Sequence, residues 1–115
     1  MNTVILSGYI GQDPQIKITK NKAYVINFSL ATKRTVKIND KYEYLTDWHY
    51  ITAFGEYNSK IIKKGYFAII KGNLRETKYN KDGKDIRYYG VFADNIEIVE
   101  TVKKGKSGFD DGSPF

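Results

Sequence analysis

One segment of the sequence alternates strictly between large apolar side chains and small or polar ones, and this pattern limits the fold more than any other feature. Between residues 23 and 33, the large apolar positions are Tyr24, Ile26, Phe28 and Leu30. Successive side chains of a β-strand point to opposite faces of the sheet, so the pattern predicts a strand with one face in a core. The chain is therefore expected to build its core from strands.

Similar extended patterns recur along the chain. Strands are predicted at residues 2–10, 23–33, 42–54, 66–79 and 86–99, with a brief extended stretch at 15–19. Residues 34–41 are charged and contain Asn39-Asp40, and we expect a hairpin loop there. Residues 80–84 (NKDGK) predict a second hairpin turn, because Asp-Gly tolerates positive φ.

One segment interrupts the strands. Residues 55–64 lack alternation and end in lysines before Gly65, which predicts a helix of about two to three turns with Gly65 at its C′ position. The predicted order is three strands, a helix and two strands. This is the order of an all-β, five-stranded Greek-key OB barrel with one short helix between strands 3 and 4. We expect this domain at residues 1–102 and a flexible, disordered tail at 103–115, which is polar and rich in glycine.

Composition limits the function. The chain has a formal net charge of +6 and 15% aromatic residues, and basic residues interleaved with aromatics are what binding of unpaired bases requires. OB domains also bind sugars and proteins, so the fold alone leaves the function open. With no cysteine and a single histidine, the sequence excludes disulfides and thiolate or His-rich metal sites, and we expect no cofactor. It has no apolar run near the ~20 residues that span a bilayer, and we expect a cytoplasmic protein.

Four segments resemble the bacterial and phage single-stranded DNA-binding proteins. They are residues 2–14 (NTVILSGYIGQDP), 27–32 (NFSLAT), 46–55 (TDWHYITAFG) and 64–75 (KGYFAIIKGNLR). The end of the chain, residues 110–115 (DDGSPF), is similar to the acidic Pro-Phe tip of that family.

The resemblance implies a protein without enzymatic activity that coats single-stranded DNA during DNA replication, recombination and repair, usually as a homotetramer. It implies base stacking by Trp48, Phe54 and Tyr79. Where the family often has another stacking aromatic, this chain has Val36, and Tyr42 or Tyr44 could substitute for it. The helix segment is about one turn shorter than in many members. Together with the short tail, this fits a phage or mobile-element version.

Candidate DNA-binding residues follow from the alternation and from the basic residues. Trp48, Tyr50 and Phe54 share one face of the strand at 42–54, with His49 on the opposite face. The candidate phosphate contacts, each of which could also be an ordinary solvated charge, are Lys33, Arg34, Lys71, Arg75, Lys78, Lys84 and Arg87.

Two further groups of residues are assigned to protein contacts. His49 lies on the face opposite Trp48, which favours a structural or subunit-contact residue over a catalytic one, and the family resemblance implies that it lies near an oligomer interface. The tip residues Asp110, Asp111, Pro114 and Phe115 are expected to bind replication or recombination proteins. A replication-restart or primosome adaptor on the same fold is the alternative function. A nuclease would need clustered carboxylates and cations, which the sequence lacks.

Overall fold

The computed structural model describes residues 1–101, which form six strands and one short helix. Their bounds are β1 Val4–Ile10, β2 Gln15–Ile18, β3 Tyr24–Ile38, β4 Lys41–Phe54, α1 Glu56–Ile61, β5 Phe67–Lys81 and β6 Lys84–Glu100. Within the described residues, no helix is long and apolar enough to cross a membrane.

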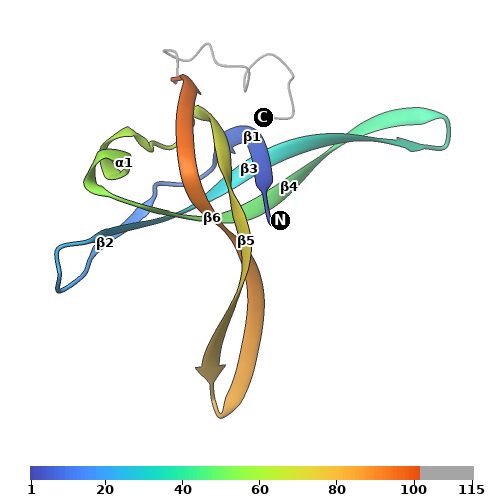
Figure 1. The fold of residues 1–115 in the computed structure, drawn as a ribbon. Coiled ribbons are helices and arrows are strands. Elements are labelled where there is room, and N and C mark those ends of the chain that lie inside the picture. Colours follow the sequence, from blue (N-terminus) through green and yellow to red (C-terminus); the bar gives the residue numbers. More distant parts are fainter. Residues whose placement is uncertain (102–115) are drawn as a thin grey trace.

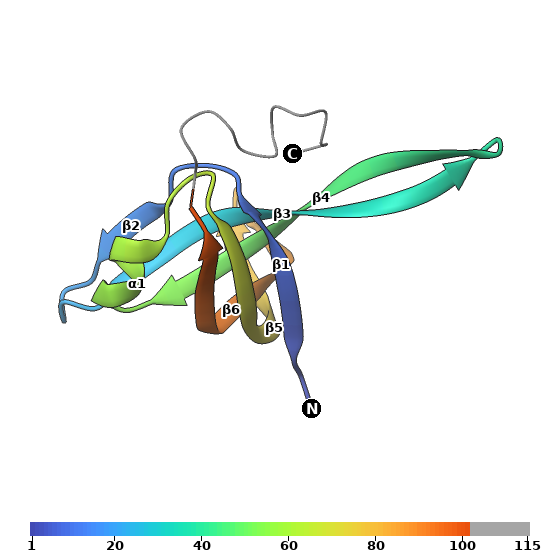
Figure 2. The same cartoon turned by 90° about the horizontal axis from the view of Figure 1, so that it is seen from above.

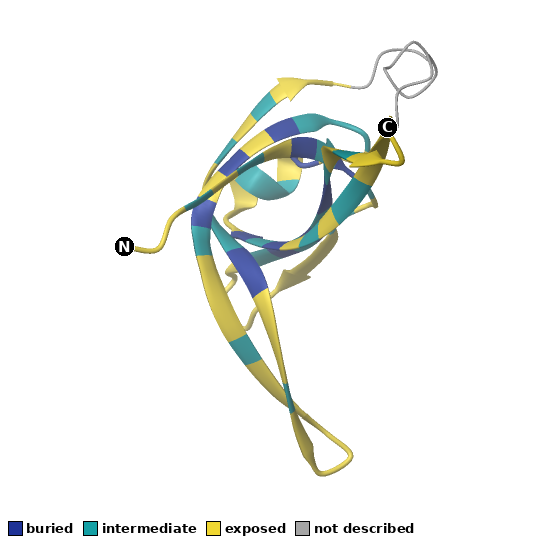
Figure 3. Ribbon diagram, turned by 90° about the vertical axis from the view of Figure 1, so that its right-hand side faces the viewer, coloured by how far each residue is buried: buried dark blue, intermediate teal, exposed yellow. Residues whose placement is uncertain are grey.

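The strands form one sheet that closes on itself. Their order is β1-β5-β6-β4-β3-β2, and β1 pairs additionally with β3 at Tyr9↔Ala31 and Ile10↔Leu30. All pairings are antiparallel except that of β4 with β6. In Figure 3 the strands close into a ring around the core. The predicted OB barrel with a helix before its last two strands is confirmed, and the short strand β2 extends one edge of it.

The alternating segment supplies the core as expected. Ile26, Phe28 and Leu30 of β3 are buried and pack with Ile51 of β4 and Ile70 of β5. The β4 alternation is also confirmed, because Ile51 and Ala53 are buried while Trp48, Tyr50 and Phe54 are exposed on the other side.

The predicted loop at residues 34–41 is wrong, because β3 runs on to Ile38 and β4 begins at Lys41. Only Asn39 and Asp40 form the turn, with φ angles of 51° and 65°. Two consecutive residues with positive φ match the right-handed twist of the flanking strands, so a two-residue turn is sufficient. The charged residues suggested a loop, but this part of the hairpin projects beyond the core, where both faces of a strand are open to water.

Two long hairpins leave the barrel in different directions, as Figures 1 and 2 show. We call residues 33–46 the β3–β4 arm and residues 76–89 the β5–β6 arm. The second arm turns at Asp82 and Gly83, with φ angles of 53° and 81°, as the Asp-Gly signal predicted. In Figure 3 most of the β5–β6 arm, which points downward, is coloured as exposed.

The helix is shorter than predicted. It spans the six residues Glu56–Ile61, and Ile62 is already extended, with φ −84° and ψ 110°. Ile62 is 2% exposed and belongs to the core cluster. The helix therefore ends at the residue whose side chain enters the core. Gly65 follows a further turn, with φ 87°. It donates its backbone N–H to the carbonyl of Ile10 at 2.7 Å rather than capping the helix.

Candidate nucleic-acid interface

An open groove of about 760 Å³ crosses the outer face of the barrel beside the base of the β5–β6 arm. Six aromatic side chains line it, together with small and polar residues of β2, β3, β4, β5 and β6. The lining residues are Gln15, Val25, Asn27, Tyr50, Thr52, Phe54, Thr77, Tyr79, Tyr88, Tyr89, Gly90 and Phe92.

The pairing register explains why these residues meet. In the antiparallel β3–β4 pair, Thr52 lies opposite Asn27 and Phe54 lies opposite Val25. The parallel β4–β6 pair then places Thr52 beside Phe92. Since side chains alternate along each strand, the residues between these positions enter the core and these residues form one outer surface.

The rings of the groove form two groups. Tyr88 lies between Tyr50 and Tyr79, with centroid separations of 6.0 and 5.9 Å. Separately, Phe54 and Phe92 lie 6.0 Å apart with an angle of 34° between their planes. Such tilted pairs hold each other in place and leave part of each ring open to a further planar group.

Trp48 continues this surface beyond the groove. It lies two residues before Tyr50 on the same side of β4, and its side chain is 60% exposed. Its ring rests against Gly11, and its cross-strand neighbour Ala31 is only 1% exposed. Trp48 is thus fixed on small residues and retains a large open surface.

The same side of the twisted ribbon continues along the β3–β4 arm. Here Lys33 stands over the ring of Tyr44 and Lys37 over the ring of Tyr42, with distances of 4.9 and 5.9 Å from Nζ to the ring centroids. These cation–π pairs place ammonium groups beside exposed rings. Val36 pairs with Glu43 and so lies on the other side of the ribbon, and the exposed rings of this side belong to Tyr42 and Tyr44.

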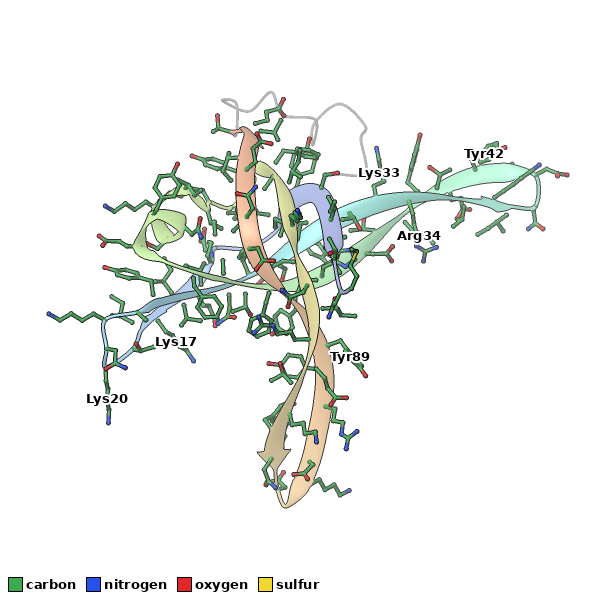
Figure 4. The ribbon with its side chains drawn as sticks, in the orientation of Figure 1. Lys17, Lys20, Lys33, Arg34, Tyr42 and Tyr89 are labelled. Atoms are coloured by element: carbon green, nitrogen blue, oxygen red, sulfur yellow. The ribbon has the colours of Figure 1, made fainter. Side chains whose placement is uncertain are left out.

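The adjacent residue Arg34 lies on the opposite side of this arm. Figure 4 shows Lys33 and Arg34 pointing in opposite directions from β3. Arg34 forms an ion pair with Asp47, with 2.8 Å between Nε and Oδ2. Its charge is therefore partly neutralised away from the aromatic side.

The remaining candidate cations are spread over the protein. Arg75 borders the groove, since its guanidinium lies 4.5 Å from the centroid of the lining residue Phe92. Lys71 lies four residues before Arg75 on the outer side of β5, outside the groove lining. Lys78 and Arg87 are cross-strand partners that alternate with the groove residues Thr77 and Tyr88. Arg87 also lies 3.9 Å from Glu76.

The residues assigned to protein contacts lie elsewhere. His49 is partly buried, and its Nε2 lies 2.7 Å from Oγ1 of Thr32 on the neighbouring strand. Lys84, a candidate phosphate contact, also lies away from the groove, at the tip of the β5–β6 arm next to the turn. Asp110, Asp111, Pro114 and Phe115 fall outside the described residues.

The sequence predictions missed Tyr88, Tyr89 and Phe92, which form much of the far wall of the groove. Their strand was predicted, and Tyr88 and Phe92 occupy alternate positions on it, but nothing in the sequence indicates that β6 lies beside β4. Among residues 1–101, no group of three or more His, Cys, Asp or Glu side chains could hold a metal ion.

The fold and this surface define a class of protein: a closed OB barrel with an aromatic groove and a hairpin arm on which lysines lie over tyrosine rings. Residues 1–99 match the single-strand binding protein family, and the chain belongs to that family. A single-stranded DNA-binding protein of Neisseria meningitidis is 31% identical over 120 residues, covering 100% of this chain and 67% of its own. One from Fusobacterium nucleatum is also 31% identical, covering 100% of this chain and 76% of its own.

Two solved structures share the fold. A deletion mutant of the single-stranded DNA-binding protein from Thermus aquaticus has a TM-score of 0.76 at 20% identity, covering 87% of this chain and 51% of its own. The Plasmodium falciparum protein, solved in complex with single-stranded DNA, has a TM-score of 0.75 at 23% identity, covering 89% of this chain and 96% of its own.

Proposed function

We propose that the protein binds single-stranded DNA without strong sequence preference, through the groove, Trp48 and the β3–β4 arm. The observation that carries this proposal is the run of exposed rings flanked by cations on one side of β4, from Phe54 through Tyr50 and Trp48 to Tyr44 and Tyr42. Each ring offers a stacking face to a base, and each base contributes about 1–3 kcal/mol by stacking.

The phosphate backbone is bound by the cations beside these rings. Lys33 and Lys37 lie over tyrosines of the arm, and Arg75 lies over a phenylalanine of the groove. A strand that stacks its bases on the rings therefore brings its phosphates near positive charge. Duplex DNA binds much more weakly, because its bases are stacked on one another and cannot reach the rings. The names of the relatives support this choice of ligand.

In the cell, this binding would protect exposed single strands during DNA replication, recombination and repair, with no chemistry performed on the strand. We place the protein in the cytoplasm as a homotetramer in which His49 lies near a subunit interface. Residues 110–115, with two acids and a terminal Pro-Phe, would recruit other replication or recombination proteins.

The direct test is a fluorescence titration of Trp48, the one tryptophan of the chain, with oligo(dT) in the presence of EDTA. We expect strong quenching, because Trp48 is exposed beside the groove, and recovery of the oligonucleotide at full length. The adaptor alternative predicts little or no binding under these conditions, and that outcome would reject the proposal. Shortening of the oligonucleotide would instead indicate a nuclease.

A further inference from the structure

A polar pair interrupts the aromatic groove at its floor. Thr52 of β4 and Asn27 of β3 are cross-strand partners, and both line the groove. The Thr52 hydroxyl donates a hydrogen bond to Oδ1 of Asn27 at 2.9 Å. Within the described residues this is the only hydrogen bond of the Asn27 side chain, so its amide hydrogens remain available to a ligand.

Aromatic pairs flank this polar pair on both sides along β4. Tyr50 and Tyr88 form one pair and Phe54 and Phe92 the other, each with ring centroids 6.0 Å apart. Tyr50 and Phe54 each lie two residues from Thr52, or about 7 Å along the strand. A base that stands between the two ring pairs therefore directs one of its edges at Thr52 and Asn27.

The pair can offer that edge both a donor and an acceptor. The Asn27 amide nitrogen has two N–H groups, and the Thr52 oxygen, having donated its hydrogen, keeps lone pairs that accept. Every unpaired base carries a neighbouring donor and acceptor on its Watson–Crick edge: N3–H and O4 in thymine, N4–H and N3 in cytosine, N6–H and N1 in adenine, N1–H and O6 in guanine. The same two side chains can therefore satisfy all four bases.

We propose that the Asn27–Thr52 pair binds the Watson–Crick edge of one unpaired base in the groove, whichever base it is. The inference rests on the proposed function and adds a polar contact to it. In a duplex this edge is occupied by the complementary base. The pair thus favours single strands over duplex through hydrogen bonding, without introducing sequence preference.

The test compares oligo(dT) with an oligonucleotide of equal length made of N3-methylthymidine, which blocks the Watson–Crick edge while leaving the ring face for stacking. The wild-type chain is expected to prefer the unmodified strand by about tenfold, the scale of one or two buried hydrogen bonds. Thr52→Val and Asn27→Ala should bind both strands equally, near the affinity of the wild type for the methylated strand. Valine is well tolerated in a strand, and circular dichroism checks that each variant folds.

Two control variants separate the pair from the groove in general. Thr52→Ser keeps the hydroxyl and should keep the preference, as should Thr77→Val, which alters another threonine of the groove lining. Equal affinity of the wild type for both strands would overturn the inference, and so would a preference that persists in Thr52→Val and Asn27→Ala. A wild-type chain that does not bind oligo(dT) at all would overturn the proposed function, and this inference with it.

Discussion

The indole ring of Trp48 lies so close to the backbone of Gly11 that a Cβ atom on residue 11 would overlap its six-membered ring. Gly11 follows β1, and Trp48 lies on β4, so two separate parts of the barrel fix the position of this ring. One side of the indole is supported by backbone while the side chain as a whole stays 60% exposed. A supported ring loses little conformational freedom when a base stacks on it, which favours binding.

Gly11→Ala is therefore expected to displace the Trp48 ring and weaken oligo(dT) binding by roughly 1 kcal/mol or more, part of one stacking contact. The emission spectrum of Trp48 should shift in the free protein, since the ring loses its support. Gly90→Ala is the control for the emission spectrum, because a Cβ there would make only ordinary contacts of 3.6 and 3.9 Å with Tyr50 and would not reach Trp48. An unchanged Trp48 spectrum in Gly11→Ala would contradict the prediction.

Trp48→Ala should reduce the free energy of oligo(dT) binding by about 1–3 kcal/mol and leave the free energy of unfolding nearly unchanged. The reason is that Trp48 is largely exposed and contributes little to the core. Ile51→Ala, three residues along the same strand but fully buried, should instead destabilise the fold by about 2–5 kcal/mol. Urea titrations followed by circular dichroism distinguish the two effects. Unfolding of Trp48→Ala under native conditions would show that this residue is structural.

The salt dependence of binding should separate the neighbouring residues Lys33 and Arg34. Each phosphate contact adds about 0.7 to the magnitude of the slope of log K against log salt concentration for a single strand. Lys33→Gln is expected to reduce the slope by about that amount, because Lys33 stands over Tyr44 on the aromatic side of the arm. Arg34→Gln should leave it unchanged, since Arg34 is paired with Asp47 on the other side. An equal salt-dependence slope in Lys33→Gln and Arg34→Gln would contradict the prediction that only Lys33 faces the bound strand.

His49→Ala is expected to weaken assembly more than strand binding. The ring lies on the side of β4 opposite Trp48 and bonds to Thr32, so its loss leaves the aromatic surface intact. Sedimentation should show smaller species than the wild type at the same concentration, while the affinity per subunit for a short oligo(dT) stays the same. A fall in that affinity with no change in sedimentation would mean that His49 supports the DNA site instead.

Removal of residues 110–115 should leave oligo(dT) affinity unchanged or slightly increased. These residues add two acidic side chains to an otherwise basic chain, and negative charge competes weakly with phosphate. The same truncation should abolish binding to replication or recombination proteins. Replacement of Asp110 and Asp111 by asparagine tests the charge alone. A clear loss of DNA affinity on truncation would place the tail among the DNA contacts.

The sequence predicted correctly that Trp48, Tyr50 and Phe54 share the exposed side of β4, because period-two alternation around Ile51 and Ala53 is a local property. It could not predict Tyr88 and Phe92 as their neighbours, since that contact depends on the parallel pairing of β4 with β6, about forty residues away along the chain. Lys33 and Arg34 lie on opposite sides of the arm, which also follows from alternation along a strand. This was not predicted from the sequence, because residues 34–41 were assigned to a loop, in which neighbouring side chains have no fixed sides.

The parallel pairing has a thermodynamic consequence. Within the described residues, β4 and β6 are joined at Ile51↔Val91 and Thr52↔Phe92. The first pair faces the core, and the second faces the groove. A ligand in the groove thus rests on a short pairing that the closed ring of strands requires, so binding of the ligand and formation of this pairing are linked equilibria. Saturation at one hundred times the dissociation constant stabilises a protein by about 2.7 kcal/mol. Much of that stabilisation should appear as slower hydrogen exchange of the backbone amides at this join, far from either hairpin tip.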